Sequence, residues 1–223
     1  MAKTKIDWCD WVYNPVWGCT GSCTYCYARK MAKRFGIVVN GKRYKDFEPR
    51  WIERNFNRPF PRKSCRIFVN SMSDLADWEP KWFNRVVGRI LHHPEHLFLF
   101  LSKHPWSIDL EGFKAVKNMM LGYSATCQSD TDRLMDVGMG EVSFLSLEPL
   151  LSNINLNLYE EMKWVIVGAE TGNRKDRVVP KLAWLVSIRD FARENRIPLF
   201  FKGSLRRIWI GELPQEYPPW PRR

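Results

Sequence analysis

The sequence lacks the features of a secreted or membrane-spanning chain. No apolar segment follows the two lysines among residues 1–5, and none of the 223 residues lies in an apolar run long enough to cross a bilayer. We therefore expect a cytoplasmic protein that does not insert into membranes. Because the cytoplasm is reducing, disulfides between the six cysteines are disfavoured.

Acidic residues are scarce relative to basic ones. The chain has 24 aspartates and glutamates against 35 lysines and arginines, which gives a formal net charge of +11. Such an excess favours polyanionic partners, of which nucleic acid is the first. Internal repeats, low-complexity segments and linkers are also missing, so we expect a single domain over residues 1–223 with an extended C-terminal tail at about 204–223.

Three cysteines form the most informative motif. Cys19, Cys23 and Cys26 follow the spacing C-x3-C-x2-C on a loop with glycine and serine spacers, and no second C-x2-C pair accompanies them. Three thiolates leave a tetrahedral ion or an iron–sulfur cluster one ligand short, and such an open position allows chemistry at the metal. A disulfide, a structural zinc ion and inert cysteines that are close by chance are the alternatives.

The remaining cysteines and the histidines give weaker signals. Cys9, Cys65 and Cys127 are candidates for a second metal site. Of the four histidines, which include His96 and His104, we expect the pair His92 and His93 to cap a helix or to face solvent. We expect none of the four to be a metal ligand.

Strand and helix patterns alternate along the chain. Apolar β-rich runs predict strands at 66–70, 97–102, 121–125, 142–147, 164–167 and 199–202. Amphipathic stretches predict helices at 24–35, 80–92, 106–118, 131–139 and 182–195. This alternation is typical of an α/β fold with a parallel sheet, although the chain is slightly short for a complete eight-fold barrel of about 250 residues.

Polar residues follow each predicted strand. Since the carboxyl ends of parallel strands open onto one face, we expect these residues to converge on one site. They are found at 70–74, 102–103, 126–128, 146–148, 168–170 and 202. For some of them, such as Ser73 and Asp74, capping of the following helix is the simpler interpretation.

The cysteine spacing, with Tyr25 just before the last cysteine, resembles that of the radical S-adenosylmethionine (SAM) superfamily. Further segments resemble an uncharacterised, often phage-associated three-cysteine family within it: 5–8, 11–19, 26–28, 70–75, 147–150 and 165–172. The resemblance covers nearly the whole chain. It implies an incomplete parallel (β/α)6-type TIM barrel.

The resemblance also implies roles for individual residues. Cys19, Cys23 and Cys26 would hold a 4Fe-4S cluster whose fourth iron is chelated by S-adenosylmethionine. The implied cofactor contacts are Tyr25, then Asn70, Ser71 and Asp74 for the amino group, Ser124 and Thr126 for the ribose or carboxylate, and Gly168 and Glu170 for the adenine edge. Glu148 and Lys103 are the candidate catalytic residues, which would reach either the cofactor or the substrate.

The implied reaction is reductive cleavage of S-adenosylmethionine to a 5′-deoxyadenosyl radical that abstracts hydrogen from a substrate. It requires an electron donor, such as flavodoxin, ferredoxin or another reductase. The protein would bind and orient the reactants and keep water away from the radical.

A basic, aromatic insertion at about 36–65 bears on the substrate. Between Lys42 and Arg66 nine basic residues stand against three acidic ones, interleaved with aromatic rings, and a hairpin turn is predicted at 39–42. Cations for phosphates and rings for bases suit single-stranded DNA or RNA, whose modification or repair is one possible reaction. Alternatively, the rings cover an open side of the barrel, or the chain is a non-catalytic nucleic-acid-binding protein that a metal or cluster stabilises.

Overall fold

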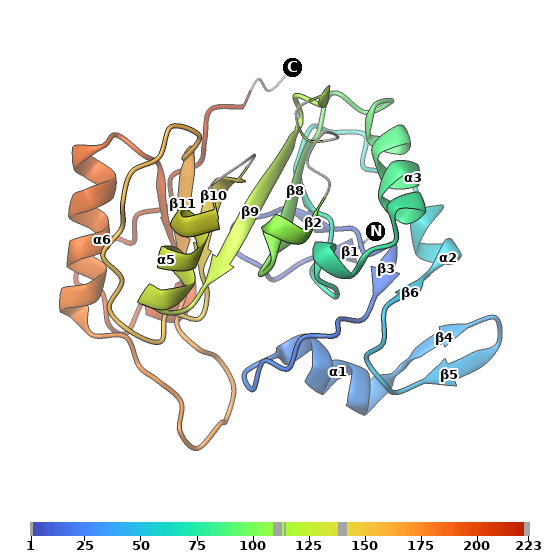
Figure 1. The fold of residues 1–223 in the computed structure, drawn as a ribbon, viewed down its shortest axis with the longest axis horizontal. Helices are drawn as coiled ribbons and strands as arrows, with labels where there is room; N and C mark the ends of the chain where they lie inside the picture. The colour runs from blue at the N-terminus through green and yellow to red at the C-terminus, as the bar shows by residue number, and fades with distance from the viewer. Residues whose placement is uncertain (1, 109–112, 114, 138–141, 221–223) are drawn as a thin grey trace. The chain divides into compact units, whose positions relative to one another are not determined.

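The computed structural model describes residues 2–108, 113, 115–137 and 142–220 (Figure 1). The chain divides into two compact units, of which the first ends at Met120 and the second begins at Leu121. Both units alternate strands and helices, so the predicted α/β class is confirmed. The single domain and the incomplete barrel stay predictions.

The sheet of the first unit contains three neighbouring parallel strands. These are β2 (Trp11–Val12), β7 (Arg66–Phe68) and β8 (Leu97–Ser102), and the short β1 (Ala2–Lys3) pairs antiparallel with β2. The first four residues of β8 are buried, as expected for a strand that is covered on both faces.

Helix α3 (Pro80–Ile90) connects β7 to β8. Proline at its first position fits a helix start, because the missing N–H would have no partner there. Val86 and Ile90 are buried, and the ring of Phe83 lies 6.3 Å from that of Phe100 in β8. Short 3-10 turns follow the two strands, η1 (Leu75–Asp77) and η2 (Pro105–Ser107). Of the helix predicted at 106–118, residues 109–112 and 114 lie outside the described residues; 106 and 107 belong to η2, and 116–118 are not helical, so the prediction is wrong at both ends.

The chain between β2 and β7 carries the cysteine loop and the insertion. β3 (Val16–Trp17) precedes the loop and pairs with β6 (Arg50–Trp51), while α1 (Tyr27–Phe35) follows the loop. The predicted hairpin is confirmed as β4 (Ile37–Val39) and β5 (Lys42–Tyr44), with positive φ at Asn40 and Gly41. The short helix α2 (Glu53–Phe56) ends this region.

The second unit has four parallel strands in chain order. They are β9 (Met119–Ala125), β10 (Val142–Leu147), β11 (Trp164–Val167) and β12 (Leu199–Phe201). Helix α5 (Gln128–Val137) follows β9, helix α6 (Leu182–Glu194) precedes β12, and the 3-10 turn η3 (Gly203–Leu205) follows it. The backbone at 214–216 runs along β12, where Phe201 N–H donates to Pro214 O at 2.7 Å.

The predicted strand positions agree closely with the structure. β8, β10 and β11 have the predicted bounds, and β7, β9 and β12 differ by two residues or fewer at each end. Within the described part of the chain, no helix combines the length and the apolar character that a membrane span needs.

Candidate metal centre

The cysteine loop is anchored at its start by Gly18. This residue has φ +109°, and a Cβ there would lie 2.1 Å from the backbone oxygen of Glu48, so only glycine allows the two backbones to approach this closely. Gly18 N–H donates to Met72 O at 2.9 Å, and Cys19 N–H donates to Phe47 O at 2.7 Å. The loop is thus fixed to the end of β7 on one side and to the insertion on the other.

Two of the three sulfur atoms accept backbone hydrogen bonds. Gly21 N–H donates to Cys19 Sγ and Arg29 N–H donates to Cys26 Sγ, each at 3.3 Å. Cys26 is the N-cap of α1, so its sulfur lies at the positive end of the helix dipole. Both features stabilise a negatively charged thiolate, which is the form that binds metal.

Arg29 supports the loop from within α1. Its guanidinium donates to the carbonyl oxygens of Cys19, at 2.9 Å, and of Gly21, and it lies 5.2 Å from the ring centre of Phe47. Its buried Nε and the buried Nε1 of Trp17 have no hydrogen-bond partner among the described residues. Trp17 packs against the same apolar side chains as Cys19, and Arg29 lies beside one of them, Phe47. Both unsatisfied donors are therefore near Cys19. Such donors suit an anionic group, as an iron–sulfur cluster on three thiolates would be.

The Cys19 thiol is protonated unless a metal displaces its proton. Burial raises its pKa to about 12, the Gly21 N–H opposes this shift, and the carboxylates of Asp74 and Asp77 add to it. Metal binding at such a thiol releases the proton.

The sulfur atoms of the cysteine loop are not arranged as the ligands of a single zinc ion. A tetrahedral zinc ion with Zn–S distances of about 2.3 Å holds its sulfur ligands about 3.8 Å apart. Among the described residues, Cys19, Cys23 and Cys26 do not form a group whose ligand atoms all lie within 4.8 Å of one another. At least two of the three sulfur atoms are therefore farther apart than the ligands of one zinc ion.

Asn70 uses its side-chain amide to join two strands. Its Nδ2 donates to Leu101 O at 2.6 Å and to Ser73 O at 3.3 Å, and its Oδ1 accepts from Leu101 N–H at 3.0 Å. The side chain is almost completely buried. A role of this amide in cofactor binding stays a prediction, while its role in holding the ends of β7 and β8 together is plain.

Asp74 caps the turn that follows β7, as the simpler sequence interpretation expected. Its Oδ1 accepts from Ala76 N–H at 3.0 Å and from the Ser102 hydroxyl at 2.6 Å, and its Oδ2 accepts from Lys103 N–H at 2.9 Å. The carboxylate therefore fixes the backbone that leads to Lys103.

Ser71 lies in a network that connects three segments of the first unit. Asn14 Nδ2 donates to Ser71 Oγ at 3.0 Å, and Asn14 Oδ1 accepts from Met72 N–H at 3.1 Å. The Tyr27 hydroxyl donates to Ser71 O at 2.6 Å, which ties α1 to the end of β7. Ser71 is brought beside the first turn of α1, near the cysteine loop.

Two further predicted residues of the first unit meet each other. Lys103 Nζ lies 5.6 Å from the ring centre of Tyr25, which places a cation beside the residue that precedes Cys26. The structure thus brings Lys103, after β8, to the cysteine loop, as the convergence of strand ends predicted.

In the second unit, Thr126 and Glu170 are engaged within the chain. Asp130 Oδ2 accepts from Thr126 N–H at 2.7 Å and from its hydroxyl at 2.9 Å. The buried Glu170 accepts two hydrogen bonds at 2.7 Å from Arg174. Ser124, near the end of β9, is half-buried.

Glu148 and Gly168 lie side by side at the ends of β10 and β11. Lys202 Nζ is 2.8 Å from Glu148 Oε1, and the Ser146 hydroxyl is 3.5 Å from Glu148 Oε2. A Cβ at Gly168 would lie 2.7 Å from Glu148 Oε1, so glycine makes room for this ion pair. The ends of three neighbouring strands therefore lie together within this unit, while convergence of all strand ends on one site stays a prediction.

Several site residues were not identified from the sequence. Asn14, Arg29, Asp77 and Arg174 hold the predicted residues in place; Asp77, for example, accepts from Thr20 N–H at 2.9 Å and from its hydroxyl at 2.7 Å. Two signals were available: Asn14 lies in one of the segments that carry the family resemblance, and Arg174 stands four residues after Glu170, the spacing of an i,i+4 ion pair. Asp77 contacts Thr20, 57 residues away, and Arg29 reaches back over the cysteine loop, so no local pattern shows these contacts.

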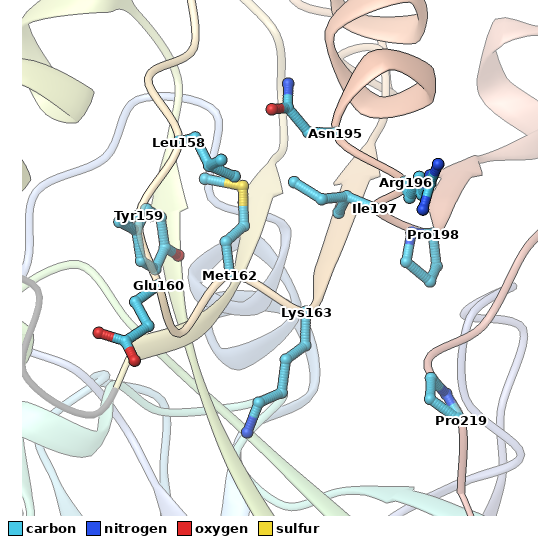
Figure 2. A pocket seen from close by; sticks show the side chains of 10 residues that line it. All are labelled: Leu158, Tyr159, Glu160, Met162, Lys163, Asn195, Arg196, Ile197, Pro198 and Pro219. Atoms are coloured by element: carbon cyan, nitrogen blue, oxygen red, sulfur yellow. The ribbon is translucent and has the colours of Figure 1, made fainter.

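A cavity of about 490 Å³ lies elsewhere in the second unit. Figure 2 shows the ten residues that line it, among them Tyr159, Met162, Lys163 and Ile197. It is located before β11 and β12 begin, and so at the opposite ends of these strands from Glu148 and Gly168. None of the predicted site residues lines it.

Comparison with known proteins gives one match. A family model described as a protein of unknown function (DUF5131) matches residues 3–207. Neither the comparison with curated proteins nor the comparison with solved structures found a match. Because the matched residues include the cysteine loop and nearly all of both units, the chain belongs to the DUF5131 family of proteins of unknown function.

Proposed function

We propose that this protein is a radical S-adenosylmethionine enzyme with a 4Fe-4S cluster on Cys19, Cys23 and Cys26. The observation that carries the proposal is the cysteine loop itself. It is anchored at Gly18, two of its sulfur atoms accept backbone hydrogen bonds, and unsatisfied donors lie in its surroundings. Each feature suits an anionic metal group better than it suits three free thiols.

When bound, the cluster and S-adenosylmethionine would supply a 5′-deoxyadenosyl radical. The residues of the chain would hold these groups and orient them. We infer that Asn70 and Asp74 act by positioning the backbone at 70–74, because their side chains already bond within the chain. Lys103, beside Tyr25, is the candidate to contact the carboxylate of the cofactor.

Anaerobic reconstitution tests the proposal. The purified chain is treated with iron and sulfide, then given S-adenosylmethionine and dithionite, and 5′-deoxyadenosine is measured by chromatography. We expect about four iron atoms per chain, following the cluster composition, and formation of 5′-deoxyadenosine. Tight zinc binding with no cluster would instead support the non-catalytic alternative.

A second proposal concerns nucleic acid as the substrate or partner. Four exposed cations follow one another in the insertion: Arg54, Arg58, Arg62 and Lys63. They form a basic stretch near α2 that suits a phosphate backbone.

The aromatic rings of the insertion are less available. Arg85 lies 4.6 Å from the ring centres of both Trp51 and Phe56, and Arg89 lies 4.4 Å from that of Phe60. Arg85 also holds the Glu53 carboxyl in a two-bond pair, which lowers the pKa of that group to about 2. Contact with nucleic acid would therefore use the cations more than the rings.

The variant Arg54→Gln, Arg58→Gln, Arg62→Gln tests this contact. Removing three phosphate contacts should lower the slope of log affinity against log salt by about 2 for a single-stranded oligonucleotide. The control exchanges Arg193, Arg206 and Arg207, three exposed arginines of the second unit, for glutamine and so makes the same change in net charge. Fluorescence anisotropy at several salt concentrations measures both. Equal slopes for the two variants would exclude a specific role of the insertion.

A further inference from the structure

The turn between α3 and β8 brings three metal-ligating side chains together. Glu95 Oε1 lies 3.1 Å from His93 Nδ1 and 3.3 Å from His96 Nε2. One ligand atom of each residue lies within 4.8 Å of those of the other two. Among the described residues, no other three potential ligands come this close together.

These separations match the coordination shell of a small divalent ion. Tetrahedral zinc with ligand distances of about 2.0–2.2 Å holds neighbouring ligand atoms about 3.3–3.6 Å apart. The two distances from Glu95 Oε1 need to grow by a few tenths of an ångström at most. Imidazole nitrogen and carboxylate oxygen are also ligand types that zinc accepts.

The burial of His96 supports a metal ligand at this position independently of the distances. The residue is fully buried, its Nε2 lies 3.3 Å from Glu95 Oε1 without the geometry of a hydrogen bond, and its ring also has a backbone hydrogen bond with Pro61. The ring packs among Phe60, Phe98 and the stacked ring of His93. A metal ion bound between Nε2 and the Glu95 carboxylate would give this buried nitrogen a directed partner.

The backbone of the turn is held rigidly by side chains around it. Asn118 Nδ2 donates to the carbonyl oxygens of His93 and His96, both at 3.0 Å, and Ser64 Oγ donates to Glu95 O at 2.6 Å. Each of the three residues is therefore fixed through its own carbonyl. Such preorganisation is typical of a binding site and lowers the entropy cost of binding.

The other ring nitrogen of His96 also has a neighbour. Cys65 Sγ lies 3.5 Å from His96 Nδ1. Metal-ligating histidines usually have a partner at the second nitrogen, which fixes the orientation of the ring. The sulfur of Cys65 would serve in this way and would not itself be a ligand.

We propose that His93, Glu95 and His96 bind a divalent transition-metal ion such as Zn²⁺ through Nδ1, Oε1 and Nε2. The site stands at the start of β8, whereas the cysteine loop contacts Met72 and Ser73, beyond the end of β7. Since β7 and β8 are parallel, the two sites lie at opposite ends of the strands. The proposal reverses the expectation that no histidine is a ligand, and it does not depend on the proposed function.

Zinc titration by calorimetry tests the site. The background variant carries serine at Cys19, Cys23 and Cys26, so that the loop does not compete for metal. We expect one Zn²⁺ per chain in this background and a loss of affinity of at least about tenfold in Glu95→Gln and in His93→Gln. The matched control is His92→Gln, because His92 is exposed and lies outside the group; its affinity should equal that of the background.

A second measurement covers failure of the background variant to fold. Co²⁺ is added to the chain with all its cysteines, where thiolate sites give strong sulfur-to-metal absorption and a site of nitrogen and oxygen ligands does not. We expect the histidine site to add ligand-field bands to any sulfur-to-metal absorption of the cysteine loop, and we expect these added bands to be lost in Glu95→Gln but not in His92→Gln. No saturable binding outside the cysteine loop, or equal binding by Glu95→Gln and His92→Gln, would overturn the proposal.

Discussion

The variant Cys23→Ala is expected to abolish cleavage of S-adenosylmethionine, down to the level seen without protein. Two remaining thiolates cannot hold a 4Fe-4S cluster, so iron, sulfide and 5′-deoxyadenosine formation should be lost together. Cys23 is the best of the three positions for this test, because Cys19 and Cys26 also pack against the apolar cluster of Phe47 and its neighbours. A change at Cys23 therefore removes a ligand with the least change in packing.

Cys127→Ala is the matched control for this prediction. Cys127 is half-buried and lies 3.2 Å from the Ser129 hydroxyl in the second unit, outside the cysteine loop. It should keep the cluster and the cleavage activity. Circular dichroism establishes that both variants are folded, and iron content and chromatography then compare them. Turnover retained by a folded Cys23→Ala chain would disprove the cluster assignment.

Gly18→Ala is expected to be the most destabilising of the glycine substitutions. The new Cβ would lie 2.1 Å from the oxygen and 2.3 Å from the carbonyl carbon of Glu48, both of which belong to the backbone and cannot rotate away. The residue also has φ +109°, where L residues are strained. We expect the free energy of unfolding to fall by about 3 kcal/mol or more, measured by urea denaturation of the metal-free chain.

Two other glycines separate the contributions to this effect. Gly41 has φ +79° with open space around its missing Cβ, so Gly41→Ala should show the backbone strain alone, about 1–2 kcal/mol. Gly88 lies within α3 with open space and no unusual φ, so Gly88→Ala should be neutral or stabilising by up to about 1 kcal/mol. A loss in Gly18→Ala no larger than that in Gly41→Ala would contradict the role given to the Glu48 backbone.

Sequence patterns predicted the regular elements because these depend on local periodicity. The apolar run of β8 and the amphipathic spacing of α3 are properties of consecutive residues, and both elements were placed within two residues of their observed ends. The short strands β2, β3 and β6 were not predicted, because two residues carry no periodicity of their own.

The candidate site was predicted in part. The convergence of strand ends followed from topology, and the contacts of Lys103 with Tyr25 and of Lys202 with Glu148 agree with it. The hydrogen-bond partners of each side chain did not follow from the topology. Asp74 and Glu170 carry the same kind of group, yet one accepts from the backbone and a hydroxyl while the other forms a buried pair with Arg174. The partners of Asp74 come from a segment that lies near it only in the fold, whereas Arg174 is a neighbour of Glu170 in the sequence and only the fold buries the carboxylate of their pair.

The sequence by itself determined the α/β class, the bounds of the main strands, the cysteine loop and the glycine turn of the hairpin, since each is encoded in neighbouring residues. Tertiary structure decided which polar groups are already bonded and which are not. It anchored Gly18 on the Glu48 backbone, and it brought ligand atoms of His93, Glu95 and His96 within 4.8 Å of one another, with His96 fully buried. Burial and the directions of side chains depend on the whole fold, so no local pattern could predict them.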